Sequence, residues 1–263
     1  MFLQIQADNP PLKPDVIFNI GNFPVSNSLL MIWVILILLI VVCLTIRRFK
    51  ITPRNKYQHI IEIVYESMLT FIEQLTGSKK YAKKLFPLIA GLFVFIGISN
   101  LIGLIPGLTS ITYEGVSLLR TPTNDFNTTF SIALAMVILT QIISIRDWGI
   151  FGHLGKYFKF KELYLGFKQG FGAGFQAIIE FLIGLLDIVS EIAKTISLSL
   201  RLFGNMYAGE TLAIVILGAL AYGLPSVWLA MNLLVAVVQA LVFGSLTAAY
   251  YMISLKPAEE NEN

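Results

Sequence analysis

An arginine lies deep inside the apolar stretch Ser197-Leu-Ser-Leu-Arg201-Leu-Phe-Gly-Asn205-Met-Tyr-Ala-Gly-Glu210. Placing an arginine at the centre of a membrane helix costs about 3 kcal/mol on biological insertion scales and more in simulations. The guanidinium does not avoid this cost by losing its proton, because its pKa lies above about 12. A permanent charge at position 201 therefore needs a partner or a function inside the membrane.

The composition of the whole chain indicates a polytopic membrane protein. Of its 263 residues, 56% are hydrophobic and only 13% are charged, whereas a soluble domain carries about 25% charged residues. The single cysteine, Cys43, excludes an intrachain disulfide. The sequence contains no phosphate-binding loop, nucleophile elbow or zinc motif, so we expect no enzyme active site, cofactor or metal. The basic residues flank apolar segments, which argues against binding of nucleic acid.

Five apolar segments are long enough to cross a membrane, since about 20 residues span the hydrocarbon core. They cover residues 28–46, 86–106, 127–145, 171–218 and 226–255. The segment 54–76 differs, because glutamates recur among its apolar residues at the spacing of an amphipathic helix, so we expect it to lie at the membrane interface. The predicted fold class is therefore an all-α polytopic membrane protein, a single membrane domain of five membrane helices and one interfacial helix. The prediction also includes an outer N-terminal segment (1–27), a basic loop (146–170) and an inner tail (256–263).

The basic residues predict how the chain is oriented. Of the 19 Lys and Arg residues, Lys13 and Arg120 lie on the side of the amino terminus, and Lys194 and Arg201 lie within a span. All the others fall on the opposite side if the chain crosses five times. Because cytoplasmic loops carry the excess of positive charge, we expect the amino terminus outside and the carboxyl terminus in the cytoplasm.

The segment 171–218 is too long to cross the membrane upright. At about 1.5 Å per residue a helix of this length extends roughly 70 Å, more than twice the ~30 Å of the hydrocarbon core. We therefore expect this helix and the segment 226–255 to form a hairpin of long, steeply tilted helices.

Polar side chains form a stripe along this long helix. At the helical period they fall within about 80° of one another, and they are Glu180, Asp187, Glu191, Lys194, Arg201 and Asn205. Ionisable residues inside a membrane face a water-filled cavity or a partner, so we interpret the stripe as a polar pathway or a protein contact face. A merely solvated face is the alternative, above all for Glu180.

A second polar layer is predicted by counting from the turn near Gly223. Arg201 and Gln239 are separated from this turn by similar numbers of residues, so they are expected at the same depth. Glu210 and Asn232 are likewise expected to share a depth nearer the turn. Two polar layers between apolar helices are typical of an ion path. For Gln239 a hydrogen bond that only joins the two helices is the alternative.

The stretch 197–210 resembles the signature of subunit a of the rotary F-type ATP synthase, of the bacterial type. Three other stretches resemble the same family: Gln239-Ala-Leu-Val-Phe-Gly-Ser-Leu-Thr247, Asn100-Leu-Ile-Gly-Leu-Ile-Pro106-Gly107 and Pro122-Thr-Asn-Asp-Phe-Asn127. The resemblance covers about residues 28–255. It implies a non-catalytic stator subunit of the bacterial plasma membrane, which works with a ring of c subunits, peripheral-stalk b subunits and the rest of the ATP synthase.

The resemblance also implies roles for individual residues. Arg201 would face the carboxylate of the rotating ring and favour its ionised form, because a nearby cation stabilises a carboxylate. Two offset proton half-channels would couple proton flow to rotation. The expected ion-pathway residues towards the outside are Asn205, Glu210 and Gln239, with Asn232 at the depth of Glu210 and Asp125 at the outer channel mouth. Further along the long helix the expected ion-pathway residues are Asp187, Glu191, Lys194 and Ser197. Asn232 departs from the family pattern, which often has His or Glu there, and Asn does not titrate.

Two other classes of protein fit part of the pattern. A secondary transporter would use Arg201 to bind an anionic substrate, but such transporters usually show internal repeats and broken helices, and this sequence shows no repeat. A structural membrane scaffold would tolerate apolar substitutions along the stripe.

Overall fold

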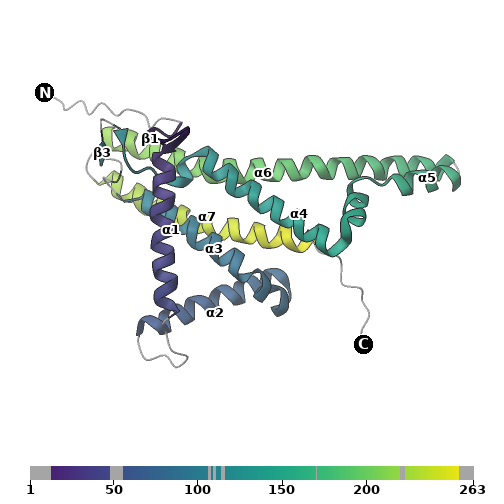
Figure 1. Ribbon diagram of the computed structural model, residues 1–263, viewed down its shortest axis with the longest axis horizontal. Coiled ribbons are helices and arrows are strands. Elements are labelled where there is room, and N and C mark those ends of the chain that lie inside the picture. The colour runs from purple at the N-terminus through teal and green to yellow at the C-terminus, as the bar shows by residue number, and fades with distance from the viewer. Residues whose placement is uncertain are drawn as a thin grey trace. The chain divides into compact units, whose positions relative to one another are not determined.

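The computed structural model of the chain is built mainly of helices (Figure 1). It describes residues 13–47, 56–105, 108, 111–113, 116–169, 171–219 and 223–254. Five helices in this described part are long and apolar enough to cross a membrane. They confirm the predicted all-α polytopic class.

The helices follow one another along the chain, and two small antiparallel hairpins lie among them. The helices are α1 (Asn27–Ile46), α2 (Lys56–Thr76), α3 (Lys79–Gly103), the short η2 (Pro122–Asn124), α4 (Phe126–Tyr157), α5 (Phe160–Gln169), α6 (Phe171–Ala219) and α7 (Leu224–Ser254). The hairpins pair β1 (Val16–Ile20) with β2 (Phe23–Ser26) and β3 (Thr112–Tyr113) with β4 (Val116–Ser117). The chain separates into two units. The first comprises Met1–Thr129 and Leu200–Ala248, and the second comprises Phe130–Ser199 and Ala249–Asn263.

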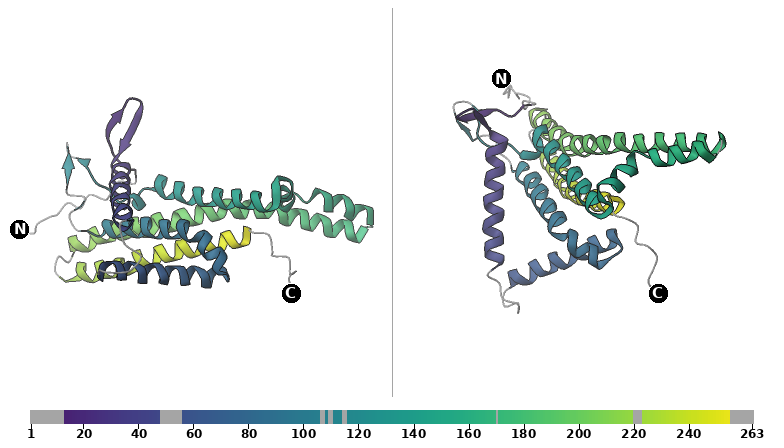
Figure 2. Two further views of the ribbon diagram at one scale, coloured as in Figure 1. Left: turned by 60° about the horizontal axis from the view of Figure 1, so that its bottom comes forward. Right: turned by 45° about the vertical axis from the view of Figure 1, so that its right-hand side comes forward.

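In the first unit, α3 lies beside α7 (Figure 2). Asn100 Nδ2 on α3 donates to the carbonyl of Ala236 on α7 at 3.4 Å. A Cβ added to Gly244 of α7 would lie only 3.2 Å from Ile89 Cγ2. Small residues let membrane helices approach closely, so these contacts define a tightly packed pair that supports the site described below.

Helix α2 packs against α3, with the rings of Tyr65 and Phe86 4.5 Å apart. It is not among the five candidate spans of the described residues. Ile60 and Val64 are exposed on one side of the helix, whereas Ile72 is fully buried. The placement of α2 at the membrane interface stays a prediction.

In the second unit, the prediction of a loop over 146–170 is wrong. Helix α4 continues to Tyr157 with a bend at Gly149, and α5 follows. Gly149 has φ 74° and ψ 162°, a conformation that essentially only glycine adopts. After the bend, His153 Nδ1 lies 3.0 Å from Ser144 Oγ, and the Tyr157 hydroxyl donates to Gln141 Oε1 at 2.9 Å. The part of α4 after Gly149 therefore folds back along the part before it.

Helix α6 runs without interruption from Phe171 to Ala219 (Figure 1), which corresponds to about 70 Å at 1.5 Å per residue. Its last part and the first part of α7 belong to the first unit, where Trp228 Nε1 donates to the carbonyl of Gly209 at 3.1 Å. These two parts form the predicted hairpin. Its steep tilt in a bilayer stays a prediction.

Candidate functional site

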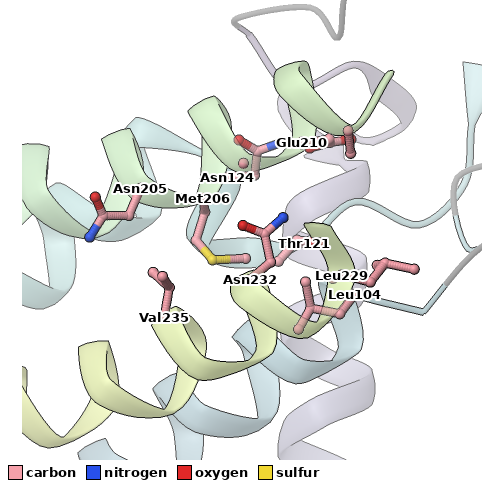
Figure 3. A pocket seen from close by; sticks show the side chains of 12 residues that line it. Leu104, Thr121, Asn124, Asn205, Met206, Glu210, Leu229, Asn232 and Val235 are labelled. Atoms are coloured by element: carbon pink, nitrogen blue, oxygen red, sulfur yellow. Dashed lines mark hydrogen bonds between the residues drawn. The ribbon is translucent and has the colours of Figure 1, made fainter. Parts of the chain in front are cut away.

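A cavity of about 80 Å³ lies in the first unit, where the end of α3, η2, α6 and α7 meet (Figure 3). Its polar lining consists of Thr121, Asn124, Asn205, Glu210 and Asn232, and the other lining residues are apolar or glycine. One water molecule needs about 10–15 Å³ of cavity volume, so this cavity has room for several waters.

Glu210 is the carboxylate of this cavity. The side-chain amide of Asn124 donates a short hydrogen bond to Glu210 Oε2. Asn232 faces the same space from α7, as Figure 3 shows, and it packs against Gly209, where an added Cβ would lie 3.2 Å from Asn232 Oδ1. Glu210 and Asn232 thus lie together, as the count from the hairpin turn predicted.

Arg120 lies next to the cavity, and sequence reasoning missed it. Only 5% of its surface is exposed. Its Nη1 donates to the carbonyl of Lys13 at 2.9 Å, and its Nη2 donates to the carbonyl of Asn124 at 3.0 Å. Its positive charge also acts on Glu210. The sequence could have drawn attention to Arg120, because it is one of only two basic residues that the charge distribution assigns to the side of the amino terminus.

Asn205 and Gln239 connect α6 to α7. Asn205 Nδ2 donates to Gln239 Oε1 at 2.9 Å. Gln239 is 5% exposed, and its Nε2 has no hydrogen-bond partner among the described residues. The interhelical hydrogen bond that the sequence left open is therefore present, and its partner is Asn205.

Arg201 is exposed, whereas the next residue, Leu202, is fully buried. No hydrogen bond or ion pair of Arg201 occurs within the described part of the chain. Ser197, one turn earlier, is exposed as well. Because Leu202 packs inward, Arg201 lies on a face of α6 that the described residues leave exposed.

The other charged residues of the stripe belong to the second unit. Lys194 Nζ lies 2.7 Å from Glu191 Oε1 and 5.0 Å from the centre of the Tyr250 ring, and Asp187 is exposed. Burial, and then the negative charge of Glu191, raise the pKa of the nearby Tyr157 hydroxyl, which lies beyond the candidate span of α4. The predicted pathway residues are thus divided between the two units rather than gathered at one site.

The role of Asp125 at the outer channel mouth stays a prediction, and the structure shows which groups its carboxylate binds. Asp125 is 5% exposed and does not line the cavity. Its carboxylate accepts hydrogen bonds from Ser28 Oγ at 2.8 Å, from the backbone N–H of Asn127 at 3.1 Å and from Thr128 Oγ1 at 3.1 Å. A side chain that precedes a helix and accepts a hydrogen bond from a backbone N–H of the first turn is an N-cap. Asp125 therefore caps α4 and ties it to α1.

Comparisons with known proteins agree on one family. The family model described as the ATP synthase A chain matches residues 29–252. The chain is 30% identical to the ATP synthase subunit a of Moorella thermoacetica over 91% of this chain and 95% of that protein. It is 32% identical to the ATP synthase subunit a of Desulforamulus reducens over 85% of this chain and 77% of that protein. For the ATP synthase subunit a of Legionella pneumophila the identity is 30% over 89% of this chain and 88% of that protein.

Proposed function

This chain belongs to the ATP synthase A chain family, and from this premise we propose that it translocates protons as the non-catalytic subunit a of a bacterial F-type ATP synthase. In this function it couples proton flow to the rotation of a ring of c subunits. The observation that carries the proposal is Arg201, a permanent charge on an apolar helix, exposed and without a partner among the described residues.

Arg201 acts as an electrostatic gate. A ring carboxylate that passes through lipid must be neutral, because a charge in an apolar medium is costly. Beside a cation the ionised carboxylate is favoured. The carboxylate therefore releases its proton opposite Arg201 and binds one again before it returns to lipid. A lysine is less suited to this role, because burial lowers its pKa and lets it lose its charge.

The cavity around Glu210 serves as the half-channel that opens to the outside. Its polar lining, its room for water and its single carboxylate support this assignment. Asn205 and Gln239 continue the polar path along α6 and α7 from Glu210 towards Arg201. Asn232 contributes hydrogen bonds to water but no proton, so titration in this layer rests on Glu210.

The residues Asp187, Glu191 and Lys194 serve the half-channel that opens to the cytoplasm. They lie on the same helix as Arg201 but in a different unit from the cavity. Two separate polar sites are what obligate rotation requires, because a continuous channel would let protons cross without turning the ring.

The partners and orientation follow from the same function. Long apolar side chains on α6 and α7 are exposed in the isolated chain, among them Leu200, Leu212, Leu234 and Val238. Lipid and the c ring would cover these surfaces, and the peripheral-stalk b subunits and the rest of the ATP synthase complete the assembly. The amino terminus lies outside and the carboxyl terminus in the cytoplasm of a bacterial plasma membrane.

The test uses ATP-driven proton pumping in membrane vesicles that contain the complete ATP synthase. Arg201→Ala abolishes pumping while the complex still assembles. Arg146→Ala is the matched control, because Arg146 is an exposed arginine of α4 outside the stripe, and it pumps like the wild type. Normal pumping in assembled Arg201→Ala vesicles would refute the proposed function.

A further inference from the structure

Arg120 is buried where a charge is costly unless another charge or hydrogen bonds compensate it. Two of its donors bind backbone carbonyls of segments far apart in the sequence, at Lys13 and at Asn124. Neither carbonyl carries a net negative charge. A nearby carboxylate lowers the cost of burying the guanidinium further.

Glu210 is the carboxylate that lines the neighbouring cavity. The side chain of Asn124 binds Glu210, while its backbone carbonyl accepts the hydrogen bond from Arg120. The other residues that line the cavity, from α3, η2, α6 and α7, carry no charge. Asp125 directs its carboxylate to Ser28 and the start of α4 instead. Arg120 thus contacts the residue that binds Glu210, and its charge also acts on Glu210 itself.

We propose that Arg120 is the fixed counter-charge of the Glu210 proton site. The inference rests on the proposed function, in which Glu210 binds and releases protons on their way to the ring. Apolar walls favour the neutral carboxylic acid, whereas a nearby cation favours the ionised form. Arg120 never titrates, so it offsets the apolar walls and favours the ionised form of Glu210 at every pH. It is a positioning residue as well, because it holds Asn124 against the carboxylate.

The experiment measures the pH profile of proton-driven ATP synthesis by the complete complex in liposomes, with the pH varied on the side that supplies protons. In Arg120→Gln the midpoint of the profile moves to higher pH by about one unit, the size expected for losing a nearby opposite charge. Arg120→Lys retains the charge and keeps the midpoint close to that of the wild type. Arg146→Gln, which removes an exposed arginine elsewhere, leaves the profile unchanged. An unshifted profile in active Arg120→Gln overturns the inference.

A second measurement applies if Arg120→Gln assembles poorly. Glu210→Gln leaves the buried guanidinium without its anion, and removal of one partner of a buried pair destabilises the other. The double variant Arg120→Gln/Glu210→Gln removes both charges. The fold-decrease in the amount of assembled complex is therefore smaller for the double variant than the product of the fold-decreases for the two single variants. Losses that simply multiply show that the two residues act independently and overturn the inference.

Arg201→Ala separates this inference from the proposed function. If pumping is lost in Arg201→Ala but Arg120→Gln is unshifted, the role of Arg120 alone is refuted. If Arg201→Ala pumps normally, the proposed function is refuted, and the role of Arg120 falls with it.

Discussion

Asn205 on α6 donates a hydrogen bond of 2.9 Å to Gln239 on α7, 34 positions away in the sequence. Gln239 is almost fully buried, whereas Asn205 is exposed. The bond therefore joins a polar group inside the helix pair to a polar group on the surface that also presents Arg201. This geometry connects the two helices, and it is compatible with the polar pathway proposed above.

The energetic part of this bond is measured by a double-mutant cycle. Interhelical hydrogen bonds in membrane proteins contribute about 0.6 kcal/mol on average. Thermal unfolding of the purified complex with Asn205→Ala, Gln239→Ala and both changes yields a coupling free energy of roughly this size. Ser245→Ala is the matched control, because Ser245 Oγ donates only to the carbonyl of Leu241 within α7. A cycle of Asn205→Ala with Ser245→Ala shows no coupling, and a similar coupling in both cycles would contradict a specific bond between Asn205 and Gln239.

A close approach between α3 and the segment before η2 supports the cavity. A Cβ at Gly103 would lie 2.6 Å from Thr121 Oγ1 and 2.9 Å from Thr121 Cγ2. Because Thr121 is buried beside Arg120, the added methyl group of Gly103→Ala displaces the segment that carries Asn124. We expect a loss of about 1–3 kcal/mol in stability from overpacking, together with slower proton pumping.

Gly91→Ala is the control for this change, since it lies on the same helix and an added Cβ meets nothing within 4 Å. Alanine is the better helix former by about 1 kcal/mol, so Gly91→Ala keeps or raises the thermal midpoint of the complex. Equal midpoints and equal pumping rates in the two variants would show that the contact with Thr121 does not constrain the cavity.

Asp125 gives a prediction that separates a helix cap from a channel carboxylate. Asn and Ser also cap helices well, whereas Ala does not, and loss of a cap costs about 0.5–2 kcal/mol. Asp125→Asn therefore keeps most of the thermal stability and most of the pumping, and Asp125→Ala loses stability. A proton site would behave differently, since Asn removes the titratable group entirely. Loss of pumping in a well-assembled Asp125→Asn complex would show that Asp125 takes part in the ion pathway.

The sequence predicts best what depends on helix geometry alone. The length of α6 and the joint position of Glu210 and Asn232 follow from a constant rise per residue and from the place of one turn. Arg201 is recognisable because a charge inside an apolar helix is costly wherever the helix packs. These features need no knowledge of how the connecting segments fold.

The features that the sequence did not predict depend on contacts between distant segments. Arg120 reads as an ordinary charge of an outer loop, and its burial depends on a hydrogen bond to Lys13 across 107 positions. The sequence predicts Asp125 as a carboxylate at the outer channel mouth but does not reveal its hydrogen bond with Ser28 of α1. The basic composition of residues 146–170 suggests a loop, although the bend at Gly149 allows a helix to follow it. A glycine in such a segment does not reveal from the sequence alone which backbone conformation it adopts.

The bend at Gly149 provides the last prediction. An L side chain in the conformation of Gly149 costs about 1–3 kcal/mol, so Gly149→Ala straightens the bend or retains it under strain. Straightening breaks the contacts of His153 with Ser144 and of Tyr157 with Gln141, whereas a retained bend lowers the stability by its strain. We expect a lower thermal midpoint of the complex in Gly149→Ala. Gly155→Ala is the control, because that glycine lies after the same bend, has an ordinary φ and has open space around an added Cβ. If Gly149→Ala were as stable as Gly155→Ala, the backbone at position 149 would not require glycine.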